Sequence, residues 1–117
     1  MTDIEKKLKE FDENVFYGIA DNALNETIWD CIVFGRKTVK HSVNKTSASD
    51  YFDVLIIREN YIPEDFDTKI IEALCTLSGV KLSGENCVFD YVMKPNTNTV
   101  VEMLTIPFVR ARKRDVV

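Results

Sequence analysis

The closing stretch CVFDYVMKPNTNTVVEMLTIPFVRARKR (residues 87–114) most constrains the fold, because it holds two apolar segments on either side of one tight turn. In the turn, Pro95 presets the φ angle at the first corner of a type I turn, and asparagine tolerates the remaining positions. With Lys94 opposite Thr99, the two segments form an antiparallel hairpin with one register along its length. The sequence therefore predicts two neighbouring strands at the end of the chain.

This register sorts the side chains of the hairpin onto two faces. One face is expected to join the core, and it carries Cys87, Phe89, Tyr91, Met93, Val100, Glu102, Leu104 and Ile106. The other face is of mixed character, pairing Val88 with Thr105, Asp90 with Met103, and Val92 with Val101. It is more apolar than a solvated face, so it is a candidate contact surface. The candidates on it are Val88, Val92, Val101 and Met103.

Two segments before the hairpin predict a strand and a helix. YFDVLIIRE (51–59) is apolar on both faces, which is typical of a strand that is central in a sheet or covered on both sides. IPEDFDTKIIEALCTLSG (62–79) reads as a helix, with Pro63 in its first turn and Gly79 as its stop. One apolar stripe on this helix must lie on the sheet, and it consists of Phe66, Ile70, Ile71, Leu74 and Leu77.

The N-terminal part predicts a second helix and two strands. Thr2 and Glu5 have the spacing of a capping box, and apolar residues follow at helical intervals, so a short amphipathic helix is expected to end near Glu13. VFYGIA (15–20) is predicted to be a short edge strand, residues 21–27 a loop, and IWDCIVFG (28–35) a buried strand.

These elements predict a single domain over residues 1–117 with an α+β fold of two layers. Its sheet is expected to be mostly antiparallel, of about four to five strands, with two helices in the order α-β-β-β-α-β-β. Two helices cover one face of such a sheet, so the apolar surface left on the other face favours self-assembly. The alternative is that the first helix covers the second face and gives three layers.

Charge is divided unevenly along the chain. The net charge is −4 in total, whereas residues 110–117 carry +3, so residues 1–109 carry −7. An acidic body with a basic end favours contact with an acidic neighbour, including another copy of the chain. Pro107 removes an amide just before this end, which predicts that the last third of its strand lies at an edge. The basic candidates in the C-terminal tail are Arg110, Arg112, Lys113 and Arg114.

A second basic stretch occupies residues 36–50, and it has no acidic side chain before Asp50. A polar stretch of this length is typical of a functional or disordered loop. Two interpretations stay open: a flexible solvated loop, or a contact arm in which residues 39–43 extend the preceding strand into a protruding hairpin. The candidate contacts here are Arg36, Lys37, Lys40 and Lys45.

No pattern indicates catalysis or a cofactor. His41 is the single histidine and has no partner at metal-ligand spacing, and the three cysteines are predicted to be small buried residues. Nucleotide-binding loops and nucleophile motifs are absent from the sequence. The N-terminus lacks an apolar signal region, and no apolar run approaches the ~18 residues of a membrane span. Aromatic and basic residues do not interleave as in RNA-recognition strands, so no sequence-specific nucleic-acid binding is expected.

The order of elements and two motifs resemble a known family. The motifs are RENYIPE (58–64), which leads into the second helix, and NTNTVVEM (96–103), which opens the last strand. They are similar to the tail-terminator, or tail-completion, family of neck proteins in long-tailed bacteriophages, often labelled minor capsid proteins in prophages. The resemblance spans most of the chain, while the 36–50 stretch has no counterpart in it.

The resemblance implies a non-enzymatic virion protein, made in the bacterial cytoplasm, that assembles as a ring, typically of six copies. Its implied partners are itself, the tail tube protein whose head-proximal end it caps, and a head-completion or connector protein. The ring leaves room for DNA to pass. Two alternatives stay open: a head-completion or connector adaptor in the same neck, or a non-viral dimeric small-ligand or regulatory module.

Overall fold

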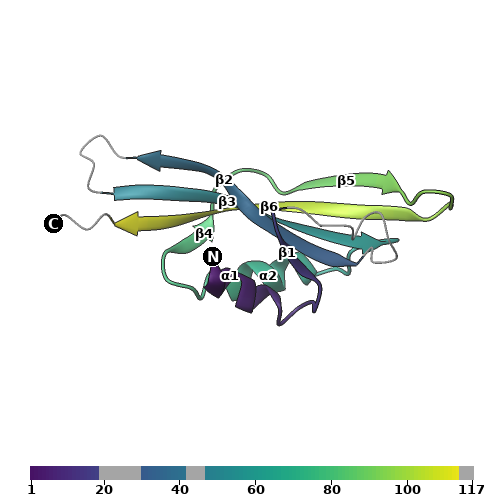
Figure 1. The fold of residues 1–117 in the computed structure, drawn as a ribbon, viewed down its shortest axis with the longest axis horizontal. Helices are drawn as coiled ribbons and strands as arrows, with labels where there is room; N and C mark the ends of the chain where they lie inside the picture. The colour runs from purple at the N-terminus through teal and green to yellow at the C-terminus, as the bar shows by residue number, and fades with distance from the viewer. Residues whose placement is uncertain (19–29, 42–46, 114–117) are drawn as a thin grey trace.

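A computed structural model describes residues 1–18, 30–41 and 47–113 of the protein, with the backbone alone at residues 47, 112 and 113. The predicted loop at 21–27 and the first residues of the predicted strand at 28–35 lie outside this part. Its elements follow in the order α1 (Thr2–Leu8), β1 (Val15–Tyr17), β2 (Cys31–His41), β3 (Ser47–Glu59), α2 (Phe66–Leu74), β4 (Val80–Leu82), β5 (Val88–Met93) and β6 (Val100–Lys113) (Figure 1).

The strands form one sheet in the order β1-β2-β3-β6-β4, and β5 pairs with β6 beside β4. β1 runs parallel to β2, and the other described pairs are antiparallel. The predicted α+β class with a mostly antiparallel sheet is therefore confirmed. Within the described ranges the sheet has six strands rather than four to five. The extra strand is β4, whose three residues are too few to show a period in the sequence.

The predicted register of the closing hairpin is confirmed from Val88 opposite Thr105 to Met93 opposite Val100. At the turn, the Lys94 amide donates to the Thr99 carbonyl at 2.9 Å, as the prediction required. The turn type is different. Asn96 has φ 63°, and a positive φ at this position belongs to a type II turn rather than type I.

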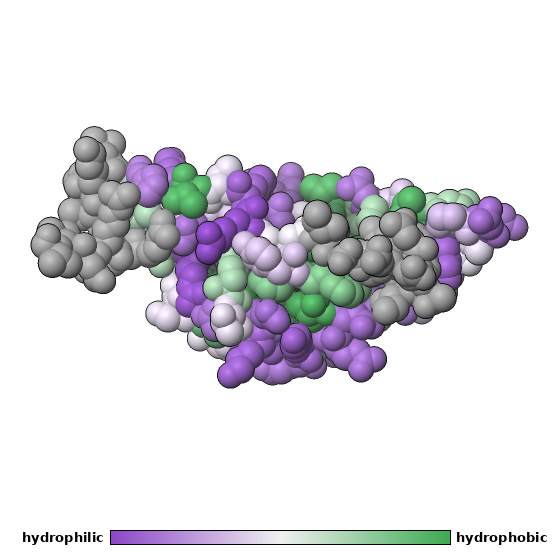
Figure 2. Space-filling view, in the orientation of Figure 1, coloured by the Kyte–Doolittle hydropathy of each residue, from purple (hydrophilic) through white to green (hydrophobic). Residues whose placement is uncertain are grey.

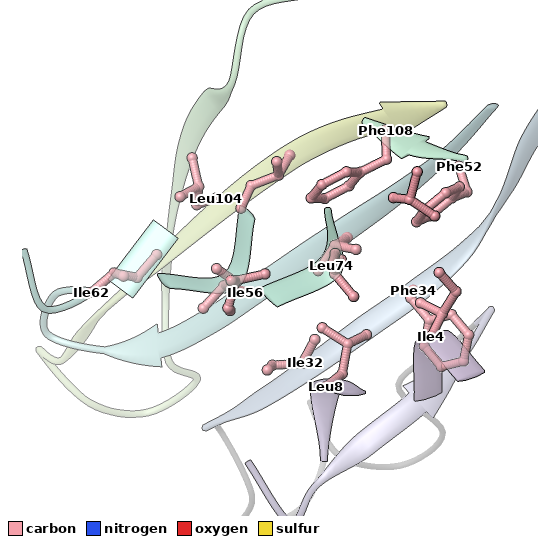
Figure 3. Packing of buried hydrophobic residues seen from close by; sticks show 14 residues of the cluster. Ile4, Leu8, Ile32, Phe34, Phe52, Ile56, Ile62, Leu74, Leu104 and Phe108 are labelled. Atoms are coloured by element: carbon pink, nitrogen blue, oxygen red, sulfur yellow. The ribbon is translucent and has the colours of Figure 1, made fainter. Parts of the chain in front are cut away.

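Both helices cover the same face of the sheet, so the two-layer prediction is confirmed and the three-layer alternative is wrong (Figure 1). Figure 3 shows Ile4 and Leu8 of α1 and Leu74 of α2 turned toward strand residues on that face. The strand residues that complete this core include Ile32, Phe34, Phe52, Val54, Ile56, Leu104, Ile106 and Phe108.

The helices are shorter than expected, although their apolar stripes are as predicted. α2 begins at Phe66, after Asp65 at φ 69°, so Pro63 precedes the helix instead of opening it. Its stripe packs on the sheet, with Ile70 buried at its centre. α1 ends at Leu8 rather than near Glu13, and no side chain caps its start.

A second, smaller cluster lies on the sheet face opposite the helices. It consists of buried Cys31, Val33, Ile57 and Val101, with Phe16, Leu55 and Met103 packed against them. β3 thus contributes to both clusters, and it pairs with β2 on one side and β6 on the other. The prediction that residues 51–59 form a central strand is confirmed.

The stretch at 36–50 is mainly strand rather than loop, which corrects the first interpretation of it. β2 continues to His41 and β3 begins at Ser47, so the two strands form an arm that projects beyond the helices (Figure 1). Its polar side chains are compatible with strand because cross-strand pairing, continued by β6, overrides local propensity.

The prediction of an edge at Pro107 is wrong, because β6 is paired on both sides there. β3 pairs along one side from Val101 to Lys113, while β5 and then β4 pair along the other. Ser83 donates its amide to the Pro107 carbonyl at 3.1 Å, so the position of the missing proline amide also faces β4 and β5. It lies where the partner strand changes from β5 to β4, and proline removes one amide donor on that side of β6.

The molecule is elongated, with extents of 56 × 26 × 24 Å. Its radius of gyration is 15.6 Å, against about 13 Å for a compact domain of this length. The β2–β3 arm projects at one end and the β5–β6 arm at the other (Figure 1). Two opposite ends therefore carry exposed strands.

Candidate functional site

The β5–β6 arm exposes apolar side chains on both of its faces. The exposed fractions along β5 are 50% for Val88, 48% for Phe89, 62% for Tyr91, 41% for Val92 and 53% for Met93. Asp90 is the single charged residue of the strand. A strand with one solvated face would alternate apolar and polar residues. In Figure 2, hydrophobic colour recurs along the upper margin, where β5 runs in Figure 1.

This exposure corrects the predicted core face of the hairpin. Its β6 half is right for Leu104 and Ile106, which are buried under the helices, and wrong for Val100, which is 40% exposed. Its β5 half is wrong, because Phe89, Tyr91 and Met93 are exposed. Figure 1 gives the reason: β5 runs past the end of the helical layer. Alternation along the strand predicted the face correctly, but not whether anything covers it.

β5 also has an open hydrogen-bonding edge. In the described part of the chain it pairs with β6 alone. The bond from the Lys94 amide to Thr99 fixes the alternation along this antiparallel pair. Consequently the amide and carbonyl groups of Phe89, Tyr91 and Met93 point away from β6, toward the edge.

A groove of about 570 Å³ lies between the helix-side face of β5 and the segment from Tyr61 to Thr68 that leads into α2. Glu102 of β6 attaches this segment to the sheet, because its carboxylate accepts the Ile62 amide at 2.8 Å. Hydrogen bonding to the same carboxylate raises the pKa of the Tyr91 phenol. The groove is aromatic, and its acidic lining residues are Glu64, Asp65, Asp67 and Glu102.

Among the described residues, the opposite end of the molecule is basic and has a second open edge. β1 pairs with β2 only as far as Tyr17 opposite Phe34, and the Gly18 amide donates to the Phe34 carbonyl at 2.7 Å. Beyond Phe34, no other described strand pairs with the outer side of β2. The exposed side chains on this stretch are Arg36, Lys37, Thr38, Val39, Lys40 and His41.

The predicted candidates in the 36–50 stretch have different surroundings. Arg36 and Lys40 are exposed on β2. Lys37 forms an ion pair with Glu85 at 3.2 Å, and this hydrogen bond raises the pKa of its ammonium group. Lys45 lies outside the described residues.

The predicted basic tail begins inside the sheet, which is a correction. β6 continues to Lys113, where the backbones of Arg112 and Lys113 pair with β3. Arg110 forms an ion pair with Asp3 of α1 at 2.7 Å, so it binds its own chain. Hydrogen bonding to Arg110 lowers the pKa of the Asp3 carboxyl. Arg114 lies outside the described residues.

The predicted contact surface on the far face of the hairpin is only partly accessible. Val88 and Val92 are exposed, whereas Met103 is half-buried. Val101 is fully buried against Ile57 and its neighbours, so its side chain is not an accessible contact. The accessible apolar surface lies on β5, and the sequence prediction had divided it between a core face and a contact face.

A second hollow, of about 380 Å³, lies where β1, β2 and β3 meet, and Asp53 lines it together with Tyr17 and Thr105. Oδ1 of Asp53 is buried and makes no hydrogen bond within the described part of the chain. Burial raises the pKa of this carboxyl. Sequence reasoning did not identify Asp53 as a candidate, because a polar residue in an alternating strand is typical of an ordinary solvated position.

The cysteines differ from their predicted burial at two positions. Cys31 is buried, and burial raises the pKa of its thiol to about 11. Cys75 and Cys87 are exposed. Among the described residues, no group of histidine, cysteine and acidic side chains is arranged to hold a metal ion.

In the same part of the chain, neither helix is long and apolar enough to cross a membrane. Comparison with family models and with curated proteins finds no match for this chain.

Proposed function

We propose that this protein is a structural assembly subunit, the tail terminator in the neck of a long-tailed bacteriophage. The observation that carries the proposal is β5, a strand with apolar side chains exposed on both faces and an open edge. The resemblance of RENYIPE and NTNTVVEM to tail-terminator proteins supports it. So does the placement of acidic and basic residues at opposite ends of the molecule.

Exposed apolar surface gives the driving force for assembly. Removing it from water stabilises by about 25 cal/mol per Å², so a few hundred Å² on β5 and its groove are worth several kcal/mol. Surface of this kind typically marks a protein interface. Self-association is therefore the first activity that the proposal requires.

In the proposed role, copies of the chain form a ring, six in the family that the chain resembles, on the head-proximal end of the tail tube. The ring stops the tube from growing and offers its other side to a head-completion or connector protein. DNA passes through its centre. The protein acts by binding and not by catalysis, and it resides in the virion after synthesis in the bacterial cytoplasm.

Disruption of the gene in the phage or prophage that carries it tests the role. Electron microscopy of the lysate should show tails of irregular length that are separate from full heads, and the wild-type gene in trans should restore joined particles. Tails of normal length beside heads that have lost DNA would instead indicate a head-completion or connector adaptor. Normal infectious particles without the gene would rule out both neck functions.

A further inference from the structure

We propose that the open edge of β5 in one copy pairs, antiparallel, with the open edge of β2 beyond Phe34 in the next copy. The sheet then continues from subunit to subunit. The inference rests on the self-assembly in the proposed function, and it names the two surfaces that meet and their register.

These two edges differ from the other edges of the sheet. β1 and β4 have three residues each, and short edges of this kind protect a sheet from pairing with another chain. β5 has six residues, and the outer side of β2 from Arg36 to His41 is of matching length. An open edge with unpaired amides and carbonyls is a template for strand addition.

The strand directions fit. β5 runs antiparallel to β6, β6 to β3, and β3 to β2. β5 and β2 of one copy are therefore antiparallel to each other. Two copies in the same orientation, with their helices on the same side, consequently present antiparallel edges when the β5 end of one meets the β2 end of the other.

The hydrogen-bonding groups fit in one register. On β5, Tyr91 and Phe89 point their backbone groups outward. On β2, the Gly18 amide donates to the Phe34 carbonyl, so the backbone groups of Phe34 point outward. The register of β2 with β3 shifts between Arg36 and Thr38, but β3 pairs with β6 without a shift, so the alternation along β3 fixes the direction of the β2 residues beyond that point. By this alternation, the backbone groups of Val39 and His41 also point outward. When Tyr91 lies opposite Val39 and Phe89 lies opposite His41, the outward amide and carbonyl groups of β5 meet those of β2.

The side chains fit in the same register. Asp90 then lies opposite Lys40, and both residues are on the sheet face away from the helices, as their partners Met103 and Ser49 are. On the helix side, Tyr91 covers Val39, which is 44% exposed in the single chain. Aromatic pairs with β-branched residues and pairs of opposite charge are the cross-strand pairs that stabilise sheets.

One molecule cannot make this contact within itself, because its two arms project at opposite ends (Figure 1). The contact joins two different surfaces, so each copy keeps one free edge after binding. Head-to-tail contacts of this kind generate closed rings or filaments. A ring of the proposed kind follows when the rotation between copies closes.

A charge exchange tests the contact. Lys40→Asp and Asp90→Lys should each raise the concentration for half-assembly by about three- to tenfold, because like charges then face each other across the strands. An equimolar mixture of the two variants should assemble like the wild type, since each altered edge meets an opposite charge on the other variant. The measurement is sedimentation velocity of the full chain over a concentration series. A mixture as defective as its components would overturn the inference.

A proline substitution tests the backbone pairing. Phe89→Pro removes an amide that points to the open edge, whereas Phe89→Ala removes the same ring and keeps the amide. Proline is tolerated on edge strands, so both variants should fold, with circular dichroism as the check. We expect Phe89→Pro to abolish assembly and Phe89→Ala to retain part of it. Equal assembly of the two variants would contradict strand pairing. If the Phe89→Pro variant does not fold, the charge exchange is the deciding test.

The outcomes separate this inference from the proposed function. If the wild type assembles and neither test changes assembly, the inference is wrong and the neck role stands. If the charge exchange holds while gene disruption leaves particles normal, the neck role is wrong and the strand contact stands. A wild-type chain that stays monomeric overturns the inference.

Discussion

At the scale of single residues, Arg58 connects three parts of the molecule. It extends from β3, forms an ion pair with Asp12 at 2.8 Å, and lies over the Phe66 ring of α2 at 4.9 Å. The side chains of this pair are 15% and 9% exposed, so water screens them little. Arg58 thus fixes both the segment after α1 and the start of α2 on the sheet.

Arg58→Ala should lower the free energy of unfolding by about 1.5–3 kcal/mol, the range for hydrogen bonds to charged groups, because Asp12 loses its cationic partner and keeps only the Asn14 amide. Arg58→Lys keeps the charge without the planar stack on Phe66, and it should recover part of the loss. Urea melts measure both. A loss below about 0.5 kcal/mol for Arg58→Ala would mean that the pair behaves as an exposed surface pair.

The buried carboxyl of Asp53 should give the stability of the fold an unusual pH dependence. Burial raises its pKa in the folded state above the ordinary value of 3.8, so the ionised form destabilises the fold at neutral pH. Asp53→Asn should therefore raise the melting temperature at pH 7, and the difference should vanish as the pH falls through the raised pKa toward the unfolded value.

Asp3→Asn is the control of opposite sign. The Arg110 hydrogen bond lowers the pKa of Asp3, so its contribution is present above the unfolded value of 3.8 and is lost as the pH falls through the lowered one. This variant should be less stable than the wild type at pH 7. Melting curves at pH 7 and in acid check both signs, and an Asp53→Asn variant that melts below the wild type at pH 7 would contradict the burial argument.

At the scale of elements, α2 is the helix on which the core depends. Leu74 is buried among strand residues at the C-terminal end of the helix (Figure 3). Leu74→Ala should cost about 2–5 kcal/mol, the range for truncating a buried leucine. Lys69→Ala, on the exposed side of the same helix, should change stability by less than about 0.5 kcal/mol. Denaturant melts in which the two variants lose similar stability would show that the helix register is wrong.

The pair Val92 and Val101 separates the assembly surface from the core. The two residues lie opposite each other, yet Val101 is fully buried and Val92 is exposed. Val92→Glu should leave the melting temperature nearly unchanged and weaken assembly, whereas Val101→Glu should unfold the chain because it buries an unpaired charge. Circular dichroism beside light scattering measures both. A folded Val101→Glu variant, or an unfolded Val92→Glu variant, would reverse the assignment.

The elements that could be predicted from the sequence are those specified by residues close together in the chain. Turn chemistry at Pro95 fixed the register of the closing hairpin, and the apolar stripe on α2 predicted its contact with the sheet. The exposure of β5 depends on where the helical layer ends, and alternation along a strand carries no information about that distance. The 36–41 stretch is polar, and it is a strand because β3 pairs with it.

At the scale of the whole molecule, shape and charge act together. The acidic groove lies beneath the β5 arm, and the exposed basic residues of β2 lie on the arm at the other end. Sequence predicted an acidic body with a basic end, but assigned that end to the last residues of the chain. Arg110 in fact binds Asp3, and the accessible basic edge is formed by β2.

Head-to-tail self-assembly is the property on which the proposed function and the strand contact both depend. Mass photometry of the purified full chain over a concentration series, with negative-stain electron microscopy of the same sample, tests it most directly. We predict one closed oligomer that forms cooperatively, appears as a ring, and dissociates at high salt as the charged edges are screened. A chain that stays monomeric up to its solubility limit would contradict the account, as would a two-fold symmetric dimer.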